Sequence, residues 1–310
     1  MKIAFVFPGQ GSQYVGMGKE LCEHFEIARE TFAEASAALG YDLAALCFNG
    51  PAEEMNKTFR TQPCILTTSL AMQKVLLSKG VEPAVVAGHS LGEYSALAAA
   101  GMLSIKDAVR LTESRGRFMQ EAVPEGKGLM AAILGLERDK VDQICESLKS
   151  GYAAPANYNC PGQIVIAGEK PAVEEAVDLC KGAGAKRAVL LAVSVPSHCR
   201  LMEAASKKLA ELLDAVELKE PVVPIVNNAD AAFLTAIEDV KPSLIRQLSS
   251  PLLWEDSVSA IVSSGISTFI EVGPGKVLSG LIKRIDPSAK ILNVEDLKSL
   301  EKTLSELATN

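Results

Sequence analysis

The chain has 310 residues, of which 48% are hydrophobic and 22% charged, with a formal net charge of −7. This balance is typical of a globular protein; no apolar run reaches the ~18 residues of a membrane span, and the acidic charge argues against nucleic acid as the main partner. Seven cysteines occur without a Cys-x-x-Cys pair or a metal-ligand spacing, so we expect reduced thiols, a cytoplasmic location and no bound metal.

Predicted strands and helices alternate along the chain, which favours an α/β protein with a largely parallel sheet. We expect residues 3–7 to form the first buried strand, because the apolar start is too short for the core of a signal peptide. The apolar pattern then predicts a helix at 17–39, a helix at 63–79, a strand at 81–86, a helix at 91–100 and a helix at 107–123.

The stretch from 128 to 191 has a different order of elements. Its pattern predicts strands at 129–134, 153–158, 163–167 and 187–191 and helices at 138–148 and 171–182. This βαββαβ order is typical of a ferredoxin-like unit. We therefore predict that residues 126–195 form a small subdomain inserted into a larger α/β core of residues 1–125 and 196–310. The core resumes with a helix at 199–213 and a strand at 222–226.

A tight turn with a serine at its centre follows the strand at 81–86. Residues 88–92 read Gly-His-Ser-Leu-Gly and lead into the helix at 91–100. Between a strand and a helix, the spacing Gly-x-Ser-x-Gly holds a serine hydroxyl exposed above the sheet, and the glycines avoid side-chain clashes in the turn. Ser90 is therefore the predicted nucleophile, which implies a covalent acyl intermediate.

A serine nucleophile needs a base, and the chain offers three histidines. His24 lies on the amphipathic helix at 17–39, which favours a structural role. His89 is adjacent to Ser90, and neighbouring side chains on a tight turn point apart. Elimination therefore favours His198, at the predicted border of the two subdomains, as the base.

No acidic partner for the histidine stands out in the sequence. Possible carboxylates are Asp230, Asp239 and Asp256. A backbone or side-chain carbonyl could equally hold the imidazole in the required tautomer. The sequence leaves these alternatives open.

An acyl intermediate also needs two donors for its oxyanion. The turn geometry assigns one of them to the backbone N–H of Leu91. The glycine-rich loop at 8–13, directly after the first strand, is suited to supply the other. Its glycines lack the spacing of a dinucleotide-binding loop, and no Lys-Ser or Lys-Thr pair follows, which disfavours nucleotide binding.

The helical phase of residues 107–123 places one arginine on an apolar face. Arg115 shares a face with Leu111, Phe118 and Met119, whereas Arg110 and Arg117 lie on the opposite face. A buried guanidinium is costly without an anionic partner. That partner is either a structural Asp or Glu or a substrate carboxylate bound bidentately.

At these residues the chain resembles the malonyl-CoA:acyl carrier protein transacylases, a family shared with the acyltransferase domains of polyketide synthases. The resemblance extends over essentially the whole chain and is carried by residues 5–13, 61–63, 88–96, 115–116, 193–198, 226–228 and 271–278. It implies an α/β-hydrolase-like core with a ferredoxin-like subdomain. It also implies that Ser90 is acylated, that His198 is its base and that Arg115 binds the malonyl carboxylate.

The resemblance further implies roles for five other residues. Gln10 and Leu91 supply the N–H groups of the oxyanion hole. Gln247 supplies a carbonyl oxygen to the imidazole of His198. Gln62 and Asn228 match positions that line the substrate site.

The expected activity is transfer of a malonyl group from malonyl-CoA to the phosphopantetheine thiol of acyl carrier protein. The resemblance implies a ping-pong reaction through a malonyl-serine intermediate, with no cofactor and no metal. Two other functions remain possible at this point: a thioesterase or esterase with the same turn, and a catalytically silent module that binds the carrier protein. The sequence leaves open which pathway the carrier protein serves.

Overall fold

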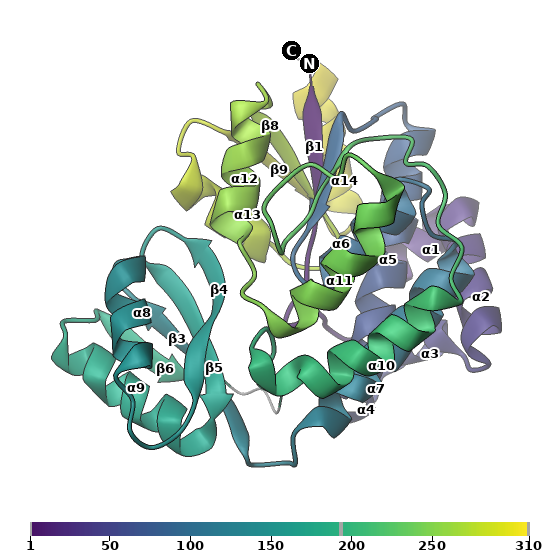
Figure 1. The fold of residues 1–310 in the computed structure, drawn as a ribbon. Helices are drawn as coiled ribbons and strands as arrows, with labels where there is room; N and C mark the ends of the chain where they lie inside the picture. The colour runs from purple at the N-terminus through teal and green to yellow at the C-terminus, as the bar shows by residue number, and fades with distance from the viewer. Residues whose placement is uncertain (1, 192–194, 309–310) are drawn as a thin grey trace.

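A computed structural model describes residues 2–191 and 195–308 (Figure 1). The larger part is built on a parallel five-stranded sheet with the strand order β7-β2-β1-β8-β9. Its strands are β1 (Ile3–Phe7), β2 (Val85–Gly88), β7 (Ile225–Val226), β8 (Thr268–Val272) and β9 (Lys290–Val294). The expected α/β architecture with a parallel sheet is confirmed.

The central strand β1 is buried on both faces, as its uninterrupted apolar sequence requires. Phe5 and Phe7 point into one core, whereas Ala4 and Val6 point into the other. Helices therefore cover both sides of the sheet, and the carboxyl ends of β1 and β2 remain free to carry loops.

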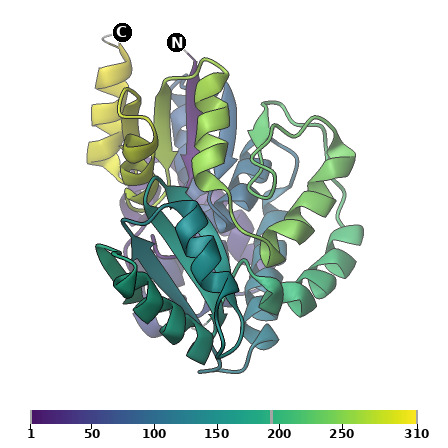
Figure 2. The ribbon, with the colours of Figure 1, turned by 60° about the vertical axis from the view of Figure 1, so that its left-hand side comes forward.

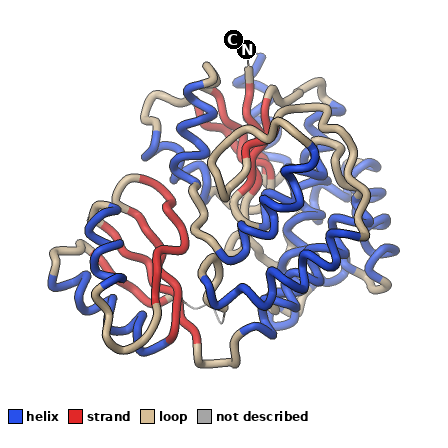
Figure 3. The backbone as a smooth tube through the Cα atoms, in the orientation of Figure 1, coloured by secondary structure: helices blue, strands red, loops and turns tan. Residues whose placement is uncertain are grey.

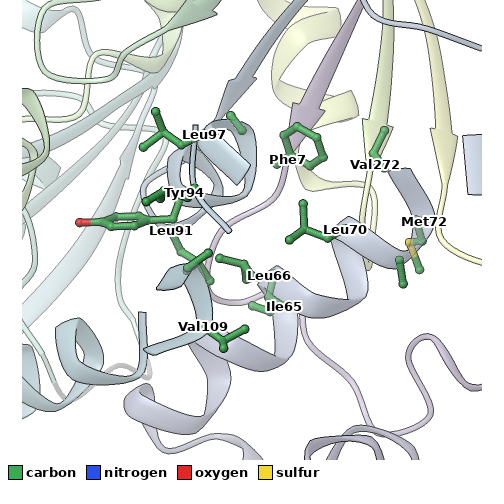
Figure 4. Close-up of a cluster of buried hydrophobic side chains, with 14 of the residues drawn as sticks. Phe7, Ile65, Leu66, Leu70, Met72, Leu91, Tyr94, Leu97, Val109 and Val272 are labelled. Carbon is green, nitrogen blue, oxygen red and sulfur yellow. The ribbon is translucent and has the colours of Figure 1, made fainter. Parts of the chain in front are cut away.

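The first core is the larger one. Figure 4 shows Phe7 and Val272 from the sheet packed near Leu66 and Leu70, with Leu91 and Leu97 close by. Helical segments that contribute to it are α1 (Lys19–His24), α2 (Glu26–Leu39), α3 (Leu43–Asn49), α4 (Ala52–Met55), α5 (Thr58–Ser78), α6 (Leu91–Ala99), α7 (Ile105–Ala122), η1 (Arg200–Met202), α10 (Glu203–Asp214), η2 (Ile237–Asp239), α11 (Val240–Ser249) and α14 (Leu297–Ala308).

The second core lies on the opposite face of the sheet. Here α12 (Trp254–Ser263) and α13 (Val277–Ile285) pack on the small side chains of β1 and β2, with Trp254 fully buried. Within the described residues, no helix is both long and apolar enough to cross a lipid bilayer.

A second, antiparallel sheet lies beside the first (Figures 2 and 3), with the order β4-β5-β3-β6. Its elements follow the order strand, helix, strand, strand, helix, strand: β3 (Gly128–Leu134), α8 (Arg138–Glu146), β4 (Ala153–Cys160), β5 (Gln163–Glu169), α9 (Lys170–Gly182) and β6 (Arg187–Leu190). The division at 126 and 195 stays a prediction; residues 192–194, including part of the motif at 193–198, lie outside the described residues.

The two faces of the small sheet have different neighbours. Ala131, Ile133 and Ile166 point into the core beneath α8 and α9. Met130 and Val165, which alternate with them along the strands, line a cavity on the other side. Because successive side chains of a strand point to opposite faces, one face of this sheet packs on its own helices and the other faces the cavity.

Several predicted helices and strands have different limits in the structure. The strand expected at 222–226 is limited to Ile225–Val226, and the helix expected at 199–213 begins as η1 at Arg200 and continues as α10 from Glu203. The helix expected at 17–39 is broken at Phe25, whose extended backbone (φ −125°, ψ 121°) separates α1 from α2. Helix α5 begins at Thr58, so Pro63 lies inside it. Helix α7 packs closely on the first turn of α5, where a Cβ on Gly116 would meet the backbone of Phe59. This packing overrides the tendency of a proline to mark the start of a helix. Strand β2 begins at Val85, after Pro83, because a proline cannot donate a ladder hydrogen bond.

Candidate active site

Ser90 sits in a strained turn between β2 and α6. Its backbone has φ 53° and ψ −104°, which is unusual for a residue with a side chain. The turn is so tight that a Cβ on Gly88 would overlap the backbone of Gly92, and a Cβ on Gly92 would overlap the carbonyl group of Phe7. Both glycines of the motif are therefore required by close backbone approach.

The side chain of Asn228, from the loop after β7, holds this turn from both sides. Its Oδ1 accepts a hydrogen bond from the Ser90 N–H at 2.8 Å, and its Nδ2 donates to the Gly88 carbonyl at 2.8 Å. Asn228 is fully buried. These two bonds support the strained conformation of Ser90. The Asn228 side chain therefore contacts the backbone of the nucleophile and not its hydroxyl.

His198 lies directly against the serine. Its Nε2 is 2.8 Å from the Ser90 Oγ, and its Nδ1 donates to the backbone carbonyl of Gln247 at 2.7 Å. A carbonyl only accepts, so this bond places the proton on Nδ1 and leaves Nε2 free to accept from the serine hydroxyl. Burial, and then the nearby charge of Arg115, lower the pKa of His198 to about 3. The imidazole is therefore a neutral base at physiological pH.

None of the three candidate aspartates occupies the position of a histidine partner. Asp230 pairs with Arg246 at 2.6 Å, Asp256 pairs with Arg138 at 2.8 Å, and Asp239 is exposed in η2. The Nδ1 position is taken by the Gln247 carbonyl. The sequence left open a carboxylate or a carbonyl as the partner of His198, and in the structure this partner is a backbone carbonyl.

Arg115 reaches the nucleophile from α7. The helix begins at Ile105, two residues earlier than expected, because Ser104 caps it by accepting from the Asp107 N–H. Arg115 is 1% exposed, and its Nη2 lies 3.1 Å from the Ser90 Oγ. As the helical phase predicted, Arg110 and Arg117 are exposed.

The partners of this guanidinium are neutral. Nη1 donates to the Gln62 Oε1 at 2.9 Å, and Nη2 donates to the Gln247 Oε1 at 3.0 Å. Within the described parts of the chain, no carboxylate bonds directly to Arg115; Glu93 acts on it at longer range, and the buried Nε of Arg115 has no hydrogen-bond partner. Burial lowers the pKa of Arg115, yet a guanidinium stays charged in proteins. The site thus holds a buried positive charge beside a nucleophile.

A cavity of about 470 Å³ opens above these groups, between the core and the small sheet. The loop at 8–13 forms one wall and lies close to the serine turn, since a Cβ on Gly9 would be 2.5 Å from the His89 carbonyl oxygen. The residues that line the cavity include Gln10, Ser90, Leu91, Arg115, Met130, Asn157, Val165, His198 and Leu281. Gln62, Asn228 and Gln247 lie behind this surface and contact it through Arg115 and Ser90.

The other two histidines are held away from the serine hydroxyl. The His89 Nε2 is 2.9 Å from the Asn159 Oδ1 of β4, and its ring lies edge-on to Trp254. His24 is exposed, with Nδ1 2.9 Å from the Glu20 carbonyl.

Glu93 is a neighbour of the catalytic residues that the sequence did not predict. It lies one turn after Ser90 on α6, is fully buried, and contacts both Asn228 and Gln247. A signal was available, because Glu93 is the only charged residue between positions 91 and 104. A lone carboxylate in an apolar helix needs buried partners.

The arrangement suits nucleophilic acyl chemistry on a substrate with a free carboxylate. The serine has a base, the base has a fixed tautomer, and the cavity contains a positive charge that can receive an anion. Among the residues that the structure describes, no three His, Cys, Asp or Glu side chains gather where they could hold a metal ion.

Comparisons with known proteins agree on one family. A family model described as "Acyl transferase domain" matches residues 4–300. The malonyl CoA-acyl carrier protein transacylase of Salmonella typhimurium is 55% identical over 92% of this chain and 93% of its own length. A solved acyl carrier protein S-malonyltransferase from Vibrio cholerae has a TM-score of 0.95 and 50% identity, covering 98% of this chain and 100% of its own.

A further solved structure contains a carrier protein. It is described as a type II polyketide acyl carrier protein, in its holo form, in complex with its malonyl-transacylase. The matched chain has a TM-score of 0.96 and 49% identity to the present one, covering 99% of this chain and 100% of its own.

Proposed function

The chain belongs to the acyl transferase family, and from that premise we propose that it transfers the malonyl group of malonyl-CoA to the phosphopantetheine thiol of acyl carrier protein. The reaction is a ping-pong transfer through a malonyl-serine. Its two halves exchange one thioester for another through an oxygen ester, so the overall step is close to thermoneutral.

In the first half-reaction, Ser90 attacks the thioester carbonyl of malonyl-CoA. His198 Nε2 takes the hydroxyl proton as the new C–O bond forms, and it then gives that proton to the departing CoA sulfur. The backbone N–H groups of Gln10 and Leu91 stabilise the oxyanion of the tetrahedral intermediate. The Gln247 carbonyl keeps the imidazole in its tautomer and stabilises the imidazolium that forms in between.

In the second half-reaction, the pantetheine thiol of the carrier protein enters the cavity in place of CoA. His198 removes the thiol proton, the sulfur attacks the malonyl ester, and the proton returns to the Ser90 oxygen as the C–O bond breaks. The residues that line the cavity come from both the core and the small sheet, which is suited to an extended arm that reaches a buried nucleophile. The pantetheine arms belong to the substrates, so the enzyme needs no cofactor of its own.

The observation that carries this proposal is the charge of Arg115. A buried structural arginine requires an anionic partner, but the partners of Arg115 are two glutamine oxygens and the Ser90 hydroxyl. Glu93 acts on Arg115 without bonding to it directly, so the fork of the guanidinium is left for the malonyl carboxylate. A generic esterase has no use for such a charge beside its nucleophile.

Arg115→Ala is expected to reduce kcat/KM for malonyl-CoA by ~10–200-fold, which corresponds to a desolvated charge-assisted contact of roughly 1.5–3 kcal/mol. The kcat/KM for acetyl-CoA should fall little or rise, because the substitution removes a positive charge that lowers the pKa of His198. Arg115→Lys should restore part of the malonyl activity, since an ammonium lacks the planar fork. Steady-state rates with both substrates, measured alongside the melting temperature, check this. Equal losses for both substrates, with a large fall in melting temperature, would assign Arg115 a structural role.

The same assay separates a transferase from a hydrolase. A transferase releases little free malonate until a second thiol is added, whereas a hydrolase releases malonate at the rate of CoA release. Intact-protein mass spectrometry after mixing with malonyl-CoA reports both the acylation and the acyl group chosen.

A cytoplasmic location is part of the proposal. All seven cysteines are buried and free of disulfides, and burial raises the pKa of several of them, for example Cys145 to about 12. Thiols that remain protonated and packed as small apolar groups are suited to a reducing compartment.

A further inference from the structure

One buried acidic group in contact with the site residues, Glu93, has no role in the mechanism proposed for them. The Oε2 atom of Glu93 accepts hydrogen bonds from the Asn228 N–H at 3.0 Å and from the Gln247 Nε2 at 2.9 Å. Its second oxygen, Oε1, is buried without a hydrogen-bond partner. Among the described residues, no other carboxylate forms a hydrogen bond with any of the residues assigned to the site.

The two partners of Glu93 connect it to every reacting group. Asn228 binds the Ser90 N–H. Gln247 donates to the Ser90 carbonyl at 3.0 Å, accepts from Arg115 through Oε1, and accepts from His198 through its backbone. One carboxylate therefore anchors the loop after β7 and helix α11 against the nucleophile.

Glu93 shares the orientation of the Gln247 amide with two other partners, the Ser90 carbonyl, which accepts from Nε2, and Arg115, which donates to Oε1. An ionised carboxylate can only accept, so the amide must turn its NH₂ group toward Glu93. That orientation leaves the amide oxygen facing Arg115, where it accepts from Nη2. The guanidinium is then held with the same nitrogen 3.1 Å from the Ser90 Oγ.

The charge of Glu93 matters for the base as well. The ring of His198 is bonded to a neutral carbonyl, and the nearest strong charge that acts on it is the positive one of Arg115. Acylation places a second positive charge on the imidazole. The negative charge of Glu93, which is linked to the imidazole through Gln247, offsets part of this second positive charge.

We propose that Glu93 is a positioning residue whose carboxylate helps to hold Gln247 and whose negative charge stabilises the imidazolium on His198 during acyl transfer. The inference rests on the proposed function, because it assigns Ser90 and His198 their roles. The direct partner of His198 is the neutral carbonyl of Gln247, and Glu93 adds a negative charge behind that partner.

The charge state of Glu93 gives the proposal a pH dependence. Burial raises the pKa of Glu93 to about 7, and the charge of Asp230 adds to that rise. The hydrogen bonds from Gln247 and Asn228 and the charge of Arg115 act in the opposite direction. The phenol of Tyr94, the neighbour on α6, stays protonated because burial raises its pKa to about 12. Glu93 thus loses its charge as the pH falls through about 7, whereas His198, with a pKa of about 3, stays neutral over that range.

The test is Glu93→Gln, which removes the charge and leaves a carbonyl oxygen that can accept both hydrogen bonds. Acylation of Ser90 by malonyl-CoA is followed in single turnovers by rapid quench and intact-protein mass spectrometry. At pH 8 we expect the maximal acylation rate to fall roughly tenfold, the order expected for the loss of one buried charge that is linked to the imidazole through Gln247. The half-saturating concentration of malonyl-CoA should fall too, because Arg115 then attracts the malonyl carboxylate without competition.

The pH profile is the second readout. The wild-type rate should rise with pH through about 7, the Glu93→Gln rate should stay flat, and the two should converge near pH 5.5. Glu93→Asp keeps the charge and should retain the rise.

The matched control is Glu271→Gln in β8, because Glu271 is another fully buried carboxylate that accepts backbone hydrogen bonds, here from Leu278 and Ser279. It should keep the wild-type profile.

Two results overturn the inference: an unchanged rise in the Glu93→Gln profile, or a lower rate combined with a higher half-saturating concentration, which is the signature of a disordered site. A wild-type protein that is not acylated on Ser90 would instead reject the proposed function, so the two failures are distinguishable.

Discussion

Ser90→Ala is expected to abolish formation of the acyl-enzyme while leaving the protein folded. The Ser90 Oγ is the only atom removed, and it lies 2.8 Å from the His198 Nε2 and 3.1 Å from the Arg115 Nη2. Loss of a serine nucleophile lowers turnover by ~10⁴-fold or more in enzymes that use one, because the remaining groups cannot form the covalent intermediate. Intact-protein mass spectrometry after mixing with malonyl-CoA measures the effect.

The fold should survive this substitution. The elbow is held by hydrogen bonds to the backbone of Gly88 and Ser90, and an alanine keeps both. The melting temperature is the control, and a matched substitution is Ser95→Ala on the same helix, whose hydroxyl is buried without a partner. Malonylation that persists in Ser90→Ala would remove Ser90 from the mechanism.

His198→Ala has the second-largest expected effect. A positioned general base contributes ~10²–10⁴-fold, so the acylation rate with malonyl-CoA should fall by that factor. The loss should be similar with malonyl and acetyl substrates, because the base acts on the serine and not on the acyl group. Single-turnover acylation kinetics provide the measurement.

His24→Ala is the control for His198→Ala. Its ring is exposed and contacts only the backbone of its own helix, so near-normal rates are expected. His89→Ala should act through the contact with Asn159 and therefore lower stability more than the chemical step. Near-normal acylation in His198→Ala would contradict the assignment and return the role of base to His89.

Local sequence determined the parts of this protein that depend on neighbours along the chain. The apolar run and the Gly-x-Ser-x-Gly spacing predicted the nucleophile turn, because steric limits on a tight turn act within a few residues. The period of α7 predicted that Arg115 would be buried and Arg117 exposed, because a helix repeats every 3.6 residues. The alternation of strands and helices predicted the parallel sheet.

Other features could be read only with the tertiary structure. The helix break at Phe25 carries no glycine or proline signal, and the start of α5 at Thr58 depends on its contact with α7. Elimination selected His198, but the residue pattern left its partner open; the family resemblance implied the Gln247 carbonyl, and the structure places that oxygen on the ring. Gln247 lies 49 residues away from His198 and offers a backbone atom that every residue has.

The network beneath the nucleophile was the least predictable part of the site. Glu93 reaches Asn228 and Gln247 across 135 and 154 positions of the chain. A local pattern shows which face of an element is buried, but it does not show which buried groups meet. That pairing is decided by how β2, β7, α6 and α11 pack, and only the packed structure reveals that, among the residues it describes, no carboxylate bonds directly to Arg115.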